Sequence, residues 1–169
     1  MIPELSRPLR VHELGALPYD IDIEAKPAER AALARRFDLI ELEQLTATLS
    51  AAKDAGGVRV TGRVAARGFQ PCALSGAPVA FGIDEAVDLR FAAVGRVPGE
   101  EVELSDADLD TIEIDGDTID LGEAAAQSFG LALDPYPRAA GAALPPAVTP
   151  EDKVVPLKRP NPFDVLKGG

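Results

Sequence analysis

The segment EQLTATLSAAKDAGGVRVTGRVAA, residues 43–66, alternates apolar and polar side chains on both sides of a glycine-rich turn. Before the turn the apolar positions are Leu45, Ala47, Leu49 and Ala51, and after it they are Val58, Val60, Gly62, Val64 and Ala66. A two-residue period places one set of side chains on each face of a strand. Residues 54–57, Asp-Ala-Gly-Gly, tolerate the positive φ angles of tight turns. The segment therefore predicts a β-hairpin with one apolar face.

The regions on either side extend this hairpin. Residues 79–94 predict a third strand, because their apolar residues (Phe81, Ile83, Val87, Leu89 and Phe91) keep the same period. Residues 4–23 predict one or two short strands. Between these amino-terminal strands and the hairpin, residues 27–37 predict a short helix. It begins at Pro27 and has Glu29 near its start and Arg35 and Arg36 near its end.

The carboxyl-terminal part changes character twice. Eleven carboxylates fall between Glu100 and Glu123 without one Lys or Arg, which predicts a mobile acidic loop at about 97–111. The dipeptide Asp115-Gly116 then predicts a turn between short apolar segments, and residues 121–133 predict a second helix that starts at Asp120 with Glu123 as a capping pair. Eight of the fifteen prolines follow Asp134, so residues 138–169 predict a largely disordered tail. Together these patterns predict one α+β domain over residues 1–137, with a mainly antiparallel, barrel-like sheet and two short helices.

Composition restricts the classes of function. The 169 residues carry a net charge of -11, no Trp and 5% aromatic residues, which disfavours broad RNA coating and base stacking. One Cys excludes an internal disulfide framework and a four-Cys zinc site. No apolar run reaches the roughly 18–20 residues of a membrane span, and the amino terminus lacks a secretory pattern. We expect a cytoplasmic protein without membrane contact.

Catalytic groups are scarce. His12 is the single imidazole and predicts a surface or strand-edge side chain, while Cys72 has no neighbouring His and predicts a buried small apolar residue. Asp106, Asp108 and Asp110 resemble the start of a calcium loop, but the required Gly and Glu are missing at its sixth and twelfth positions. We expect no catalytic residues, metal or cofactor, and hence no enzyme.

One basic surface can be located. Arg59, Arg63 and Arg67 recur on the polar face of the second hairpin strand, and Lys53 and Arg90 are candidates to join them. This arginine row predicts either a patch for phosphate or an acidic partner, or a solvated face whose arginines pair with the acidic loop.

Three segments resemble the YceD family of large ribosomal RNA subunit accumulation proteins. They are the strand pair leading into FQPCALSGAPVAFGIDEAVDLRF (residues 69–91), IDLGEAAAQSFGLALDPYPR (residues 119–138) and the closing LKRPNPFDVLK (residues 157–167). Many members of that family carry a Cys-x-x-Cys pair and later cysteines that resemble a zinc site. Here the pair is Cys72 and Ser75 and no cysteine follows, so a zinc-dependent role does not transfer.

The resemblance implies a bacterial cytoplasmic factor, with plastid relatives, that is needed for accumulation of large-subunit ribosomal RNA. The expected partners are ribosomal proteins or assembly factors of the large subunit, with only local RNA contact through the arginine row. The alternative is a protein-interaction module unrelated to ribosomes that uses its acidic loop or proline-rich tail. A magnesium-dependent nuclease built from Asp and Glu is a third hypothesis.

Overall fold

The computed structural model describes residues 3–54, 57–93, 111–114 and 116–142. In chain order the elements are β1 (Pro8–Arg10), a 3₁₀ turn (Val11–Glu13), β2 (Tyr19–Glu24), α1 (Pro27–Arg36), β3 (Glu41–Asp54), β4 (Gly57–Pro71), β5 (Pro78–Ala93), β6 (Thr111–Ile114), β7 (Thr118–Asp120) and α2 (Leu121–Ala132). Both predicted helices are confirmed, as is the α+β class. No helix in the described part of the chain is long and apolar enough to cross a membrane.

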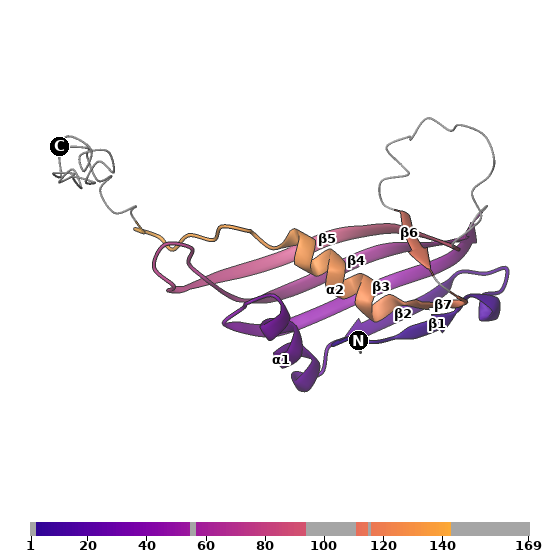
Figure 1. Cartoon of the computed structure of the whole chain (residues 1–169), viewed down its shortest axis with the longest axis horizontal. Coiled ribbons are helices and arrows are strands. Elements are labelled where there is room, and N and C mark those ends of the chain that lie inside the picture. The colour runs from indigo at the N-terminus through magenta and orange to yellow at the C-terminus, as the bar shows by residue number, and fades with distance from the viewer. Residues whose placement is uncertain (1–2, 55–56, 94–110, 115, 143–169) are drawn as a thin grey trace, which may run out of the picture.

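The strands form two sheets. A five-stranded sheet has the order β2-β3-β4-β5-β6, in which β2 to β5 are antiparallel neighbours and β6 runs parallel to β5 (Figure 1). A separate two-stranded antiparallel sheet joins β1 to β7. Asp115 of the predicted Asp115-Gly116 turn lies outside the described residues, and Gly116 falls between β6 and β7, two strands that belong to different sheets.

The hairpin predicted from the alternating segment is confirmed as β3 and β4. These strands pair from Glu41 opposite Phe69 to Asp54 opposite Gly57, with one irregularity between Leu42 and Gln44. The apolar positions predicted on β3 are all buried (Leu45, Ala47, Leu49 and Ala51). The alternation thus correctly identifies the face that packs on the core.

The prediction of a barrel-like sheet is wrong, because the sheet is open. Among the described residues its outer strands, β2 and β6, do not pair with each other. Closure would require enough strands to surround an interior filled by their own side chains. Here α2 and the β1–β7 sheet cover the apolar face instead, so the two edges stay apart (Figure 1).

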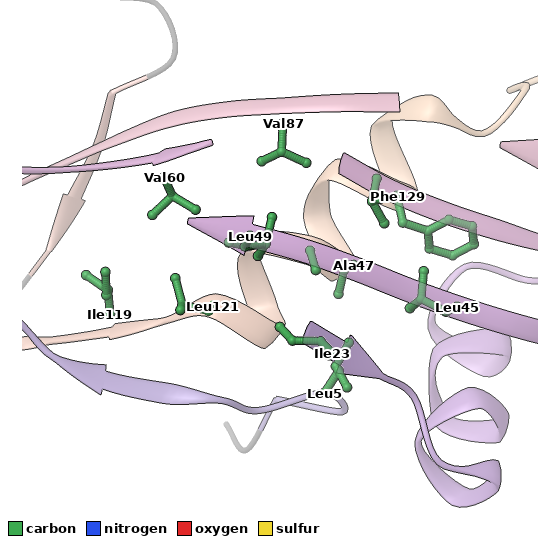
Figure 2. Close-up of a cluster of buried hydrophobic side chains, with 14 of the residues drawn as sticks. Leu5, Ile23, Leu45, Ala47, Leu49, Val60, Val87, Ile119, Leu121 and Phe129 are labelled. Atoms are coloured by element: carbon green, nitrogen blue, oxygen red, sulfur yellow. The ribbon is translucent and has the colours of Figure 1, made fainter. Parts of the chain in front are cut away.

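The core lies between the inner face of the large sheet and this covering layer. Figure 2 shows Leu45, Leu49 and Val60 of the sheet directed toward Leu121 and Phe129 of α2. Phe129 is completely buried and meets Phe37 edge to face, with ring centroids 5.4 Å apart, and Phe81 at 6.1 Å. One aromatic side chain therefore joins α2 to the end of α1 and to β5.

Asp120 holds the amino-terminal segment to the start of α2. Its Oδ1 accepts hydrogen bonds from the amides of Gly122 (2.9 Å), Glu123 (3.1 Å) and Arg7 (2.7 Å), and its Oδ2 accepts from the Ser6 hydroxyl (2.6 Å). Asp120 thus caps the helix as predicted. Glu123, its predicted capping partner, instead forms an ion pair of 2.7 Å with Arg36 of α1. This ion pair lowers the pKa of Glu123.

Two predicted segments fall largely outside the described residues: the acidic loop, apart from Thr111, and the tail beyond Ala142. The first residues of the predicted tail are described, however. Ala139 donates its amide to Cys72 Sγ at 3.3 Å, and Ala73 donates its amide to the Pro137 carbonyl at 2.8 Å. The chain therefore remains attached to the β4–β5 turn beyond Pro137.

Candidate functional site

The arginine row lies on the outer face of the large sheet, opposite the face that α2 covers. Arg59, Arg63 and Arg67 occupy alternate outward positions of β4, while the intervening Val60 and Val64 point into the core. Four residues of strand separate successive arginines by about 13 Å. Their side chains are 57–66% exposed, so each guanidinium is accessible to solvent separately.

Two of these arginines form close ion pairs with the neighbouring strand. Arg59 binds Asp88 through two hydrogen bonds of 2.9 and 2.7 Å, and Arg63 binds Asp84 at 2.9 Å. The β4–β5 register places each carboxylate diagonally across from its arginine. Hydrogen bonding to Asp88 raises the pKa of Arg59, and the Arg59 guanidinium lowers the pKa of Asp88.

The remaining arginines form longer pairs. Arg67 lies 3.6 Å from Glu43, which the irregularity in β3 brings beside it, and Arg90 lies 3.6 Å from Asp54. Arg90 is the direct cross-strand partner of Arg59, a like-charge arrangement that is unfavourable unless nearby carboxylates offset it. The four arginines thus share the outer face of the sheet, with a carboxylate beside each of them.

Lys53 does not belong to the arginine row. It is the cross-strand partner of Val58, whose side chain is buried, and directly opposed residues share a face of the sheet. Its side chain therefore lies on the opposite side of the sheet from Arg59.

Asp84 and Asp88, the carboxylates that pair with Arg63 and Arg59, are not among the residues predicted from the sequence for this surface. The two-residue period of β5 could have identified them, because both occupy positions between its apolar residues.

The centre of the outer face and its β2 edge carry polar side chains. Short hydroxyl side chains cover the centre of β3 and β4 (Thr46, Thr48, Ser50 and Thr61), and carboxylates line β2 (Asp20, Asp22 and Glu24). The face therefore presents separated arginines between acidic groups. On such a surface a phosphate can take the place of a carboxylate beside an arginine, and a basic side chain can take the place of an arginine beside a carboxylate. Each of these contacts involves only one or two residues.

His12 is the single imidazole of the chain, and the described carboxylates are candidates for a metal site. His12 is exposed in the 3₁₀ turn and pairs through Nδ1 with Asp117, which confirms its predicted surface position. Within the residues that the structure describes, no group of three or more His, Cys, Asp or Glu side chains is placed to hold a metal ion. The aspartates of the rejected calcium pattern, Asp106, Asp108 and Asp110, lie outside these residues.

Cys72 is buried, as predicted, but its surroundings are polar. The Ala139 amide is the principal hydrogen-bond donor to Sγ, and the Ser75 hydroxyl and the amides of Leu74 and Ser75 add to it, which lowers the pKa of the Cys72 thiol to about 6. Amide donors stabilise a thiolate in the way that they stabilise other anions. The description of Cys72 as a simple apolar residue is therefore incomplete.

The low pKa of Cys72 predicts a pH dependence of stability. An unfolded thiol has a pKa of about 8.5, so between about pH 6 and 8.5 the unfolded state holds the extra proton. The free energy of unfolding should therefore rise with pH across this window, and the rise should be lost in Cys72→Ser. Urea unfolding at several pH values measures it, and identical pH profiles for the two proteins would contradict the assignment.

Comparison with protein families, curated proteins and solved structures found no match to this chain.

Proposed function

We propose that this protein is a non-enzymatic, cytoplasmic factor of the YceD family that acts in biogenesis of the large ribosomal subunit. It would support accumulation or processing of large-subunit ribosomal RNA through contacts with ribosomal proteins or assembly factors. The observation that carries the proposal is the resemblance of the three sequence segments to that family. The accessible, ion-paired outer face of the sheet supports a binding role.

Two residues of the second resembling segment have clear structural roles. Asp120 caps α2, and a Cβ atom at Gly122 would lie 2.6 Å from the Leu5 carbonyl oxygen, so larger residues do not fit there without a shift of backbone. A motif made of such residues specifies how the amino-terminal segment meets α2. It supports a shared fold, and the ribosomal role comes from the resemblance itself.

The ion pairs of the arginine row define how RNA would be contacted. Exposed ion pairs contribute little to stability, so a phosphate can replace Asp84 or Asp88 at little cost. Arg59, Arg63 and Arg67 are too far apart along β4 to bind one phosphate together, and the nearby carboxylates repel a continuous polyanion. RNA contact should therefore be local, while the carboxylates of β2 face basic proteins.

Neutralising the row tests the RNA contact. The triple variant Arg59→Gln, Arg63→Gln, Arg67→Gln should bind a large-subunit ribosomal RNA transcript more weakly, with the slope of log K against log salt reduced by about 1 for each lost phosphate contact. Asp84→Asn with Asp88→Asn should act oppositely, because it frees two guanidiniums. Filter binding over a range of salt concentrations measures both effects.

The matched control neutralises three exposed arginines elsewhere: Arg10→Gln, Arg35→Gln and Arg138→Gln. It changes the net charge equally, so it separates the arginine row from overall charge. Equal affinities of the two triple variants would remove the row from the RNA contact.

Sedimentation distinguishes the ribosomal role from the alternative of an unrelated interaction module. Tagged full-length protein from gently lysed cells should migrate with large-subunit precursors and leave them at high salt. Recovery only with non-ribosomal proteins would favour the module.

A further inference from the structure

One long edge of the large sheet is open. β4 pairs with β5 along nearly its whole length, whereas β6 pairs with β5 only at residues 90–93. Residues 78–89 of β5 have no strand on their outer side among the described residues, and Figure 1 shows them as the margin of the sheet. Alternate residues of such an edge direct their amide and carbonyl groups outward, where another strand can pair with them.

A hollow of about 400 Å³ lies against this edge. It is lined by residues 85–89 of β5 and by Ser128, Leu131 and Ala132 of α2. Leu131 is 88% exposed, although the same helix buries Phe129 completely. An additional strand beside β5 would place its inward side chains over α2, where Leu131 offers an apolar contact.

The charge of the hollow indicates the chemistry of that strand. Glu85 and Asp88 contribute carboxylates, and none of the lining residues is Lys or Arg. Asp88 is already paired with Arg59, whereas Glu85 has no ion pair within the described residues. Pairing of two β5 edges from two copies would bring these acidic positions together, which is unfavourable. A basic partner is complementary where a second copy is not.

We propose that the open edge of β5 binds an extended segment of a partner protein by strand addition. Glu85 lies directly opposite the buried Val64 and so shares the face of the sheet that α2 covers. On that face the segment would place an apolar side chain on Leu131 and a Lys or Arg beside Glu85. Backbone pairing would supply the affinity common to strand addition, and the hollow would select the side chains. This inference stands without the ribosomal assignment, because it depends only on the edge, the hollow and their charge.

A designed peptide tests the proposal with the full-length protein. The probe is the fluorescein-labelled peptide Thr-Lys-Thr-Leu-Thr-Lys-Thr, whose Lys and Leu side chains share one face of an extended strand. Its binding is followed by fluorescence anisotropy at low salt. We expect a dissociation constant on the order of micromolar. Glu85→Lys with Leu131→Asp should weaken binding by about tenfold or more, because it removes the apolar contact and reverses the charge.

The control variant is Glu24→Lys with Leu17→Asp. It makes the same two types of substitution at exposed positions. Glu24 ends β2, the strand at the opposite edge of the sheet, and Leu17 precedes β2. This variant should bind the peptide like the unmodified protein. Circular dichroism establishes that both variants are folded.

A second peptide separates strand addition from simple charge attraction. It has the same sequence, but the amides of its central residues are N-methylated, so it keeps its charge and cannot pair as a strand. We expect it to bind at least about tenfold more weakly. Equal binding of the two peptides, or equal loss in the control variant, would overturn the proposal. A dimer of the protein alone that Glu85→Lys with Leu131→Asp dissociates would also overturn it, because the edge would then hold a second copy.

Discussion

Phe129→Ala is expected to lower the free energy of unfolding by about 3–5 kcal/mol, as is usual for removal of a buried phenyl ring. Phe129 is fully buried and contacts the rings of Phe37 and Phe81. Its loss therefore leaves a cavity where α2, α1 and β5 meet. Domains of this size are stable by about 5–15 kcal/mol, so the substitution should remove a large part of the total stability. Urea unfolding followed by circular dichroism measures the change.

The control for this substitution is Leu131→Ala, two residues further along α2. Leu131 is 88% exposed, so its truncation should change stability by no more than about 0.5 kcal/mol. A loss below about 1 kcal/mol for Phe129→Ala would mean that the contact between α2 and the sheet is not the centre of the core.

Asp120→Ala is expected to cost about 3 kcal/mol. The substitution removes a helix cap, which contributes about 1 kcal/mol. It also leaves the part-buried Arg7 amide and Ser6 hydroxyl without their carboxylate partner, at about 1–2 kcal/mol. Both effects act on one junction, because the carboxylate joins the amino-terminal segment to α2. Chemical denaturation measures the loss, and hydrogen exchange should show faster opening of the β1–β7 sheet.

Two controls separate the cap from the loss of charge. Asp120→Asn keeps one oxygen to accept the amides of Gly122 and Glu123, so it should retain most of the stability. Asp134→Ala removes a carboxylate whose recorded hydrogen bond, to the amide of Tyr136, lies in an exposed loop, and it should cost less than about 1 kcal/mol. Equal losses for Asp120→Asn and Asp120→Ala would show that charge, rather than hydrogen-bond geometry, stabilises the junction.

The long strands and the helices could be predicted because local patterns specify them. The alternation around Leu45 and Val60 identifies the buried face, and Asp120 marks the start of α2. The open shape of the sheet could not be predicted in this way. It depends on the pairing of Leu9 with Ile119, in two strands of three residues that are too short to show a period.

In the candidate site, the direction of each side chain could be predicted from the sequence, but its ion-pair partner could not. Alternation places Arg59 and Arg63 outward, and it also places Asp84 and Asp88 outward on β5. The pairing of each arginine with its carboxylate depends on the register between the strands, which a single-residue shift would change. Glu43 reaches Arg67 through an irregularity in β3 that no local pattern predicts.

We propose that the protein is needed for accumulation of large-subunit ribosomal RNA, and depletion of the protein from its own cells tests this role most directly. The ratio of large-subunit to small-subunit ribosomal RNA should fall, precursors of the large subunit should accumulate in sucrose gradients, and expression of the full-length chain should restore both. An unchanged ratio with an unchanged gradient profile after complete depletion would contradict the claim.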